Sequence, residues 1–512
     1  MLNYQQIKKR FDKAKANKLE WEHHLRECYR YALPQKNTFD KRSKGAKKRE
    51  YVFDSTAEDG LEDYATRMES ELVPANQNWI ALTAGTEISD DKKVQVETHL
   101  DLVTDIVFSH IKSSNFSAQV HSSFLDLGIS TGALICEEGD GIQSALNFRS
   151  VSLSELYVEE SQRGILETTF RDMTINIGDI TSIWKRAKLN DKLKEMLERD
   201  PTIEIKVIEA TIELEAGSYQ SVVLYEEHFL IDEALESTPW VVFRESTIPG
   251  ETYGRGRVMR ALADIKTLNK MMYNYLTALE WWSTPTFTGV ADGIINPSTI
   301  KIVPGSVIAV DDNSTANPSL RPLAIAGRPE LLDYAIGKLQ DNVRRILISK
   351  PFGNVEETPV RSATEMSIRN ADLAKTSLGA SGRIQNELLE RIIKRAIYIL
   401  TKAGKIPSFK VDGKEVAIRM TSPASRIQDE QQLASMGRFG EFAQMLDPQD
   451  VKRAIKLEDM PSELIDILHL PSKLKRTDAE IQEMAEAEQQ QMQQMQQQQM
   501  MMEQAKQQGG PQ

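Results

Sequence analysis

Two serine–lysine pairs have a spacing that occurs in some acyl-transfer enzymes. Ser182 with Lys185, and Ser298 with Lys301, match the Ser-x-x-Lys pattern, in which the serine hydroxyl is the nucleophile. The companion motifs of those enzymes are missing from the chain, and two matches in 512 residues are expected by chance. We therefore predict no covalent catalysis by either serine.

Phosphate, dinucleotide and metal sites are not predicted either. No Gly-Lys pair is followed by Ser or Thr after a Gly-x4 spacer, and in GRGRVMR Met259 stands where a dinucleotide fingerprint needs its third glycine. His23 and His24 are adjacent on a predicted helix and so point to different faces, which makes them poor joint ligands. Asp311 and Asp312 lie in a turn-rich segment that lacks the calcium-loop pattern. The sequence predicts no catalytic residue, no metal site and no cofactor, which favours a protein that is not an enzyme.

The charge balance limits the partners that the chain can have. Lys and Arg number 63 against 75 Asp and Glu, for a net charge of −12, so we expect no global attraction to nucleic acid. An acidic chain is still compatible with a protein past which DNA moves without binding tightly. Two distant cysteines, Cys28 and Cys136, indicate buried thiols in a reducing compartment. The first residues lack the apolar core of a signal peptide, and no apolar run approaches the roughly 18 residues that span a bilayer. We expect a cytosolic protein, or one bound to a virion after assembly in a cytosol.

The first 250 residues predict one α+β domain. Helices are expected at 1–33, from the N-capping residues 54–56 to Pro74, at 90–113 and at 116–130, and WIAL (79–82) reads as a short strand. A hairpin is expected at 138–141, and β-branched runs between turn formers predict strands from 142 to 250, interrupted by one helix at about 178–199. The basic run KRSKGAKKRE (41–50) is interpreted as a solvated loop or as a contact to phosphate.

Residues 258–349 have the pattern of two long helices that bracket an insert. Apolar residues recur every three or four positions in both helices, so each has one side suited to helix–helix packing. These residues are Val258, Leu262, Ile265, Leu268, Met272, Tyr275 and Leu279 in the first helix, and Leu332, Ile336, Leu339, Val343 and Ile346 in the second. The insert, 283–328, mixes turn residues with short β-like runs, and a loop with two prolines follows at 350–361.

A helix of roughly ten turns is predicted from Ser362 to Leu400. Ser362 and Glu365 form a capping box, in which each side chain bonds the other residue's backbone N–H. Gly379 and Gly382 mark a place where the long helix can bend, and Gly404 is suited to a left-handed C-cap. A brief β segment and several short helices are expected next. From about residue 478 the chain is Gln- and Met-rich, either helical in an assembly or disordered.

Five segments, in order along nearly the whole chain, resemble the portal (head-to-tail connector) family of short-tailed, podovirus-type bacteriophages. They are DSTAEDGLEDYATRMESELVPANQNWIAL (54–82), STGALICEEGD (130–140), YGRGR (253–257), SATEM with LGASGRIQNELLERIIKRAIYIL (362–400), and TSPASRIQDEQQLASMGRFGEFAQMLDP (421–448) with its Gln-rich sequel. The chain departs from the family pattern at Gly379-Ala380-Ser381, where a proline is expected after the glycine. This departure bears on the kink angle only.

The resemblance implies an α+β subunit of a dodecameric ring around a central channel. It maps the domains as follows: wing 1–257, stem helices 258–282 and 329–349, clip 283–328, tunnel loop 350–361, long helix and wing completion 362–420, crown 421–477, and a C-terminal helix or disordered tail 478–512. The implied function is genome packaging and ejection at one capsid vertex of the virion, after assembly in the host cytoplasm. The implied partners are double-stranded DNA, the terminase motor, capsid and scaffolding protein, and tail adaptor or nozzle proteins, without membrane insertion.

Roles for individual residues follow from the resemblance. Candidates to face DNA in the channel are Lys338, Arg344, Arg345, Lys350, Phe352 and Arg361, although ion pairs between subunits, from the basic ones to Asp333, Asp341, Glu356 or Glu357, are an open alternative. Clip residues such as Phe287, Ile294, Ile302 and Val307 are more apolar than so small an insert can bury alone. We therefore expect clip strands to pair between subunits, with a self-contained hairpin as the alternative.

Two other functions remain open from the residues. One is another ring of the head–tail junction, such as an adaptor, although adaptors are usually shorter and lack a helix–insert–helix stem. The other is a cytosolic nucleic-acid-binding scaffold that uses the basic run at 41–50 and the Gln-rich tail. The mass of the native assembly distinguishes these possibilities from a portal ring.

Overall fold

The computed structural model describes most of the first 283 residues and shorter parts of the remainder. The described residues are 1–40, 48–283 except 86, 89, 140, 142–143 and 216, then 287–289, 320–322, 329–347, 381–407, 409, 416–422, 433 and 435–439, with single positions at 464, 468, 484, 492 and 495. The chain is a mixed helix and strand protein that divides into two compact units. Unit 1 comprises 1–19, 65–255 and 355–512, and unit 2 comprises 20–64 and 256–354.

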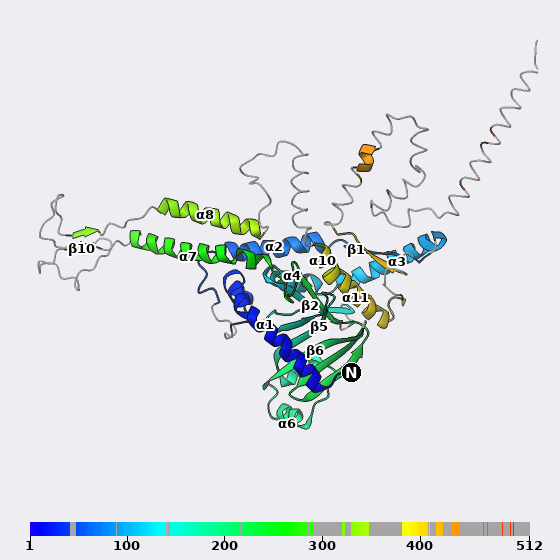
Figure 1. Cartoon of the computed structure of the whole chain (residues 1–512). Helices are drawn as coiled ribbons and strands as arrows, with labels where there is room; N and C mark the ends of the chain where they lie inside the picture. Colours follow the sequence, from blue (N-terminus) through cyan, green and yellow to red (C-terminus); the bar gives the residue numbers. More distant parts are fainter. Residues whose placement is uncertain are drawn as a thin grey trace, which may run out of the picture. The chain divides into compact units, whose positions relative to one another are not determined.

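Unit 1 contains an antiparallel five-stranded sheet in the order β4-β5-β6-β7-β8. Its strands are β4 (Leu156–Glu160), β5 (Leu166–Asn176), β6 (Glu204–Glu215), β7 (Ser218–Tyr225) and β8 (His228–Leu235). The first turns of α1 (Tyr4–Ala32) cross one face of this sheet (Figure 1), where Ile7, Phe11 and Ala14 pack against Phe170 and Val222. Each of these side chains is at most 2 % exposed, so apolar burial fixes the helix on the sheet.

A second sheet of unit 1 has the order β3-β2-β9 and packs against helix α4. Its strands are β2 (Thr131–Glu138), β3 (Leu146–Ser150) and β9 (Trp240–Arg244), and α4 spans Phe116–Ile129. The β2–β3 pairing confirms the predicted hairpin, with Cys136 opposite Phe148. The predicted strand at 79–82 is also confirmed as β1 (Ile80–Ala84). It pairs antiparallel with the distant β12 (Val416–Met420), in the register Ile80↔Met420. The helices α2 (Thr56–Leu72) and α3 (Asp90–Lys112) lie where the sequence predicts them.

The prediction of one helix at 178–199 is wrong. The structure has a 3-10 turn, η2 (Ile177–Asp179), the single-turn α5 (Ile180–Ile183), and then a separate helix α6 (Asp191–Arg199). Trp184 ends α5 with an extended backbone, and its side chain is buried in the core cluster that also contains Leu193. Asn190 begins α6 as an N-cap, since its side chain accepts a hydrogen bond from the backbone N–H of Leu193 at 2.8 Å. Burial of Trp184 therefore breaks the segment that helical periodicity favours.

The segments STGALICEEGD and YGRGR meet inside unit 1. Ser130 Oγ donates to the carbonyl oxygen of Gly254 at 2.7 Å, and the backbone N–H of Gly254 donates to Thr131 Oγ1 at 3.0 Å. A Cβ at Gly254 would lie 2.6 Å from the carbonyl oxygen of Ser130, so only glycine fits this close approach of two backbones. Tyr253 is 1 % exposed and its hydroxyl donates to the carbonyl of Leu156. These hydrogen bonds join the two segments, so their role is structural.

The described end of the long helix runs from α10 (Ser381–Ile384) through a π-helical segment η3 (Gln385–Glu390) into α11 (Arg391–Lys402). Gly382 lies in α10, immediately before the π-helical segment, which is a common form of helix irregularity. The predicted left-handed C-cap is confirmed, because Gly404 has φ +68°. The N–H of Gly404 bonds the carbonyl of Thr401 and the N–H of Lys405 bonds that of Leu400, which together form a Schellman motif.

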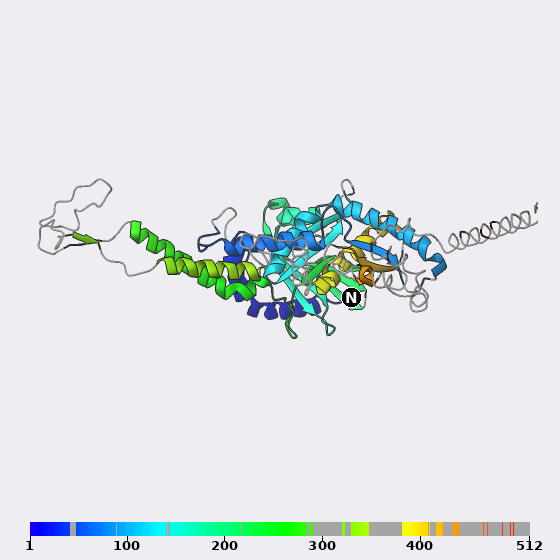
Figure 2. The same ribbon diagram turned by 90° about the horizontal axis from the view of Figure 1, so that it is seen from above.

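Unit 2 contains the two long helices that the sequence predicts around the insert. They are α7 (Arg257–Ser283) and α8 (Pro329–Ile346), and they lie side by side in both views (Figures 1 and 2). The unit also contains η1 (Pro34–Lys36) and the three-residue strands β10 (Phe287–Gly289) and β11 (Leu320–Pro322), which pair antiparallel with Phe287 opposite Pro322. The other strands predicted in the insert lie outside the described residues.

Candidate functional site

The packed pair α7–α8 is the candidate functional element, and we call it the stem. Its packing is built from the two apolar stripes of the sequence. Val258, Leu268 and Val343 are at most 1 % exposed, and Leu262, Ile265 and Ile336 are at most 6 % exposed. Burial decreases along α7, since Met272 and Tyr275 are half-buried and Leu279 is 38 % exposed. The predicted stripe is therefore a packing seam in its first half and a more exposed surface in its second half.

Polar contacts fix the register of the two stem helices. Asn342 Nδ2 on α8 donates to Asp264 Oδ2 on α7 at 2.5 Å. At the start of α7, an Arg257 guanidinium nitrogen lies 3.5 Å from the carbonyl oxygen of Ile346, near the end of α8. That oxygen is among the last carbonyls of α8, which have no partner within the helix, so the arginine also caps α8.

Residues 51–54 bind both stem helices within unit 2. The backbone N–H of Phe53 donates to Asn269 Oδ1 at 2.7 Å, and Asn269 Nδ2 donates to the carbonyl of Tyr51 at 2.8 Å, so a single α7 side chain holds both residues. Gln340 Nε2 of α8 donates to Asp54 Oδ2 at 2.7 Å, while the other oxygen of Asp54 accepts the N–H of Thr56 at the start of α2. Asp54 opens the first segment that resembles the portal family, and its structural role is to join α2 to the stem.

An ion pair between Glu27 on α1 and Lys266 on α7 makes the stability of unit 2 pH-dependent. The hydrogen bond from Lys266 Nζ to Glu27 Oε1 (2.8 Å) holds the pKa of Glu27 below its ordinary value of 4.5. A depressed carboxyl pKa means that the contribution is complete above the ordinary value and is lost as pH falls through the lowered one. The free energies of unfolding of the wild type and of Lys266→Met should therefore differ at pH 7, and this difference should shrink as the pH falls below 4.5. A difference that does not change with pH would contradict this linkage.

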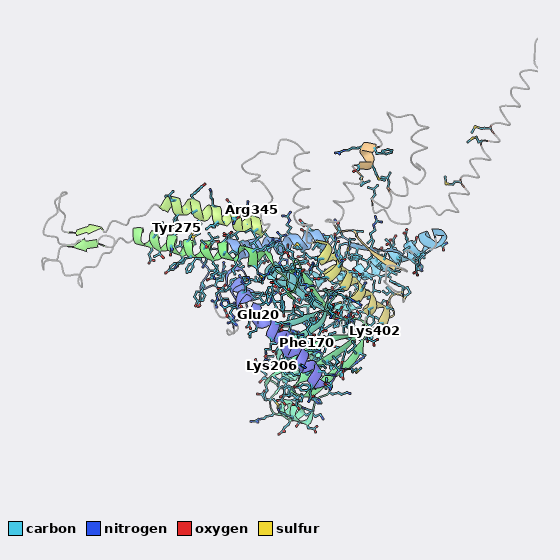
Figure 3. The ribbon with its side chains drawn as sticks, in the orientation of Figure 1. Glu20, Phe170, Lys206, Tyr275, Arg345 and Lys402 are labelled. Carbon is cyan, nitrogen blue, oxygen red and sulfur yellow. The ribbon has the colours of Figure 1, made fainter. Side chains whose placement is uncertain are left out.

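Three of the predicted DNA-facing residues lie on described parts of α8. Lys338 is exposed and its ammonium lies 4.6 Å from the ring centre of Tyr334. Arg345, which is labelled on α8 in Figure 3, is exposed and donates to Asn342 Oδ1 at 2.6 Å. Arg344 is half-buried and lies 3.8 Å from Asp341 of the same helix. This contact lies within one helix, so the ion pairs between subunits stay a prediction.

Other predicted site residues lie outside the described part of the chain. These are Lys350, Phe352, Arg361, Ser362, Glu365, Gly379, Ile294, Ile302 and Val307. Phe287 lies in β10, and only its backbone is described. Gly382 lies in α10, as given above.

The exposed face of α8 contains residues that the sequence reasoning did not single out. Leu331 and Tyr334 are 62 % and 63 % exposed, and they share the spacing of Lys338, Asp341 and Arg345 at three or four residues. This second stripe runs beside the buried one and could have been found as a second set of helical repeats. Its charges alternate in sign about one turn apart, so the face offers separated cations rather than a basic surface.

The described residues contain no cluster of three or more His, Cys, Asp or Glu that could hold a metal ion. Among the helices described, none is both long and apolar enough to cross a membrane.

Comparison with known proteins identifies relatives along nearly the whole chain. A family model described as "Bacteriophage head to tail connecting protein" matches residues 4–475. A "Probable portal protein" of Bordetella phage BPP-1 is 20% identical over 458 residues, covering 84% of this chain and 80% of the relative. A chain in a solved structure entitled "Neck of empty GTA particle computed with C6 symmetry" matches at 10% identity with a TM-score of 0.35, covering 74% of this chain and 85% of that one.

Proposed function

The chain belongs to the family of bacteriophage head-to-tail connecting proteins, and from this premise we propose that it is the subunit of a portal ring at one capsid vertex of the virion. The family consists of structural connectors, in agreement with a sequence that offers no catalytic constellation. The proposed ring is the channel through which the genome is packaged and ejected. It also serves as the docking platform for the packaging motor and then for tail proteins.

The observation that carries the proposal is the stem of two packed antiparallel helices with an exposed face of alternating charge. A closed ring needs a heterologous interface, in which one face of a subunit meets a different face of the next. The stem offers such surfaces, because Leu276 and Leu331 are 47 % and 62 % exposed on α7 and α8, respectively. In the ring that we propose, neighbouring stems cover these apolar side chains.

The domain roles belong to the same proposal. Residues 1–257 with 362–420 would be the wing, the insert 283–328 the clip, 350–361 the tunnel loop, and 421–477 the crown. The pairing of β1 with β12 supports a wing completed by the later segment, since it joins residues 80–84 to 416–420. Twelve subunits of 57.8 kDa would have a mass of about 690 kDa (12 × 57.8).

A channel for DNA must guide the duplex without holding it. Each phosphate that a protein neutralises releases counterions and strengthens binding, so a uniformly basic channel would retain DNA. On α8, Asp341 lies between Lys338 and Arg345, which limits the positive potential of the face. We propose that this face lines the channel, with Lys350 and Arg361 flanking the tunnel loop and Phe352 within it.

The DNA-facing role predicts a defect in packaging or retention without loss of the ring. Particles assembled with Lys338→Ala/Arg345→Ala, or with Lys350→Ala/Arg361→Ala, should lose a measurable part of their packaged DNA during storage. The matched control is Lys9→Ala/Lys13→Ala, which removes two exposed lysines from α1. DNA content per particle, measured over time, checks the prediction. Equal retention by all three variants and the wild type would contradict it.

The ring itself is tested by mass and by imaging of the purified protein. We expect a native species near 690 kDa, or a neighbouring ring size, and negative-stain images of rings with stain on the axis. A monomer or a dimer at micromolar concentration would contradict the proposed function.

A further inference from the structure

The stem has a second exposed stripe, on α7, that the proposed channel surface does not include. Its side chains recur every three or four residues and are all exposed; they are Arg260, Ala263, Thr267, Lys270 and Asn274. A helix turns by about 100° per residue, so this stripe lies opposite the buried side chains of Val258 and Ile265. Two of the five residues are cations, and none is an acid.

Three contacts within unit 2 occupy the other sides of α7. Asp264 bonds to α8, Asn269 bonds to residues 51 and 53, and Lys266 pairs with α1. None of these side chains belongs to the stripe. The stripe therefore occupies a side of α7 that none of these three neighbours covers.

The exposed stripe of α8 borders the stripe of α7. Arg345 donates to Asn342, which in turn donates to Asp264 of α7, one turn after Arg260. Residues four apart are neighbours on a helix surface, so Arg345 and Arg260 lie on the two sides of this helix–helix contact. The two stripes together form one surface of the stem, which we call the outer face.

Cations from both helices lie at two levels of the outer face. The hydrogen bond between Asp264 and Asn342 sets the register of the antiparallel pair. About one turn from this bond in one direction, and one to two turns in the other, each helix has an exposed cation. At 1.5 Å per residue, the two levels are roughly 10–15 Å apart. The pairs are Arg260 with Arg345, and Lys270 with Lys338.

The outer face is basic although the chain is acidic. Within the described part of the chain, neither Arg260 nor Lys270 forms an ion pair, and the Lys270 ammonium lies 4.9 Å from the ring centre of Tyr273. The two carboxylates on the face, Asp341 and the half-buried Asp264, leave its four cations with a net charge of +2. The whole chain has a net charge of −12. An anionic partner is therefore attracted to this face more than to the rest of the molecule.

The composition of the α7 stripe favours DNA over a second subunit. Ala263 and Thr267 are short, so they allow a close approach, and the amide of Asn274 is a group that bonds to phosphate oxygens. The core of a protein–protein interface is apolar and poor in charged residues. The α7 stripe has no large apolar side chain, so it does not have the composition of such a core.

We propose that Arg260 and Lys270 contact the phosphate backbone of double-stranded DNA, so that the DNA-facing surface of the stem spans both helices instead of α8 alone. The inference rests on the proposed function, because it places a ring of stems around the DNA. Cations at two separate levels guide the duplex, while the uncharged residues between them avoid the continuous basic surface that would retain it.

Crosslinking in packaged particles tests which side of α7 meets DNA. Thr267→p-benzoylphenylalanine places a photoreactive group on the outer face. The matched control is Leu276→p-benzoylphenylalanine, because Leu276 is 47 % exposed but lies nine residues later, on the opposite side of the same helix. After irradiation we expect the Thr267 variant to crosslink to DNA and the Leu276 variant not to. Crosslinks from Thr267 to a neighbouring chain alone, or equal DNA crosslinking from both positions, would overturn the proposal.

A second measurement removes the charges. Particles with Arg260→Ala/Lys270→Ala should lose packaged DNA severalfold faster than the wild type at low salt, and the difference should shrink as salt rises, since counterion release weakens. Lys9→Ala/Lys13→Ala is again the control, and native mass verifies that each variant forms rings. Loss no faster than in the control, or a difference independent of salt, would refute the contact to phosphate.

Failure of this inference is distinguishable from failure of the proposed function. A ring in which Lys338→p-benzoylphenylalanine crosslinks to DNA while the Thr267 variant does not would contradict only the role of α7. A wild-type chain that forms no ring would contradict the proposed function itself, and with it this inference.

Discussion

Deletion of residues 290–325 is expected to give a folded chain that no longer assembles into rings. The insert contains Ile294, Ile302 and Val307 among many apolar residues, more than a segment of this size can bury by itself. If clip strands pair between neighbouring subunits, the deletion removes these strand pairings from every heterologous interface of the ring. The β10–β11 pairing brings the two ends of the insert together, so the deletion leaves α7 and α8 joined by a short connection.

Native mass and unfolding measurements together check this prediction. The deleted chain should have a mass far below 690 kDa, while its far-ultraviolet circular dichroism and cooperative unfolding remain close to those of the wild type. A control deletion of 501–512, which lies outside the insert, should leave the ring intact. Rings formed by the 290–325 deletion would refute pairing between subunits and favour a self-contained hairpin.

Replacement of Arg244 is expected to be the most destabilising single change in unit 1. Its side chain is fully buried, with one terminal nitrogen 3.1 Å from Glu160 and the other 3.0 Å from Glu387. The carbonyl oxygens of Gly164 and Thr252 accept two further bonds at 3.0 Å each. The second oxygen of Glu387 accepts the backbone N–H of Arg244 at 2.9 Å. The Arg244 side chain on β9 therefore bonds to the end of β4, to the turn after β4, to the segment that precedes α7 and to the π-helical segment η3.

Arg244→Met should lower the free energy of unfolding by roughly 3–5 kcal/mol, because it leaves the partly buried carboxylate of Glu387 without the Arg244 guanidinium. Arg244→Met/Glu387→Leu should recover much of that loss, since replacing both charges by apolar groups removes the unpaired one. Urea unfolding at fixed protein concentration provides the measurement, because assembly makes the midpoint depend on concentration.

The matched control is Arg186→Met, whose side chain is 75 % exposed and lies 3.5 Å from Glu233. Surface pairs of this kind contribute little, so its midpoint should not move measurably. An Arg244→Met variant as stable as the control would show that the buried network is not needed for the fold.

The helices and many strands could be predicted because their signals are local. The stripe of α7, the capping residues before α2 and the glycine after α11 each specify structure through neighbours within four residues. The failure at 178–199 has a long-range cause: Trp184 joins the core of the five-stranded sheet, and burial of a large aromatic ring outweighs helix continuity. The sequence reasoning named Lys338 and Arg345, and their helical spacing with Asp341 can also be read from the sequence. Which side of α8 is exposed was decided by its packing on α7.

By itself, the sequence determined the family, the order of helix, insert and helix, and the absence of a recognisable catalytic motif, because these depend on residue types and their spacing. The tertiary structure alone decided that Ser130 and Thr131 bond to Gly254, and that Arg244 reaches Glu387 across 143 positions. Such contacts join residues far apart along the chain. No periodicity encodes them, and only the packing of sheets and helices brings their atoms within bonding distance.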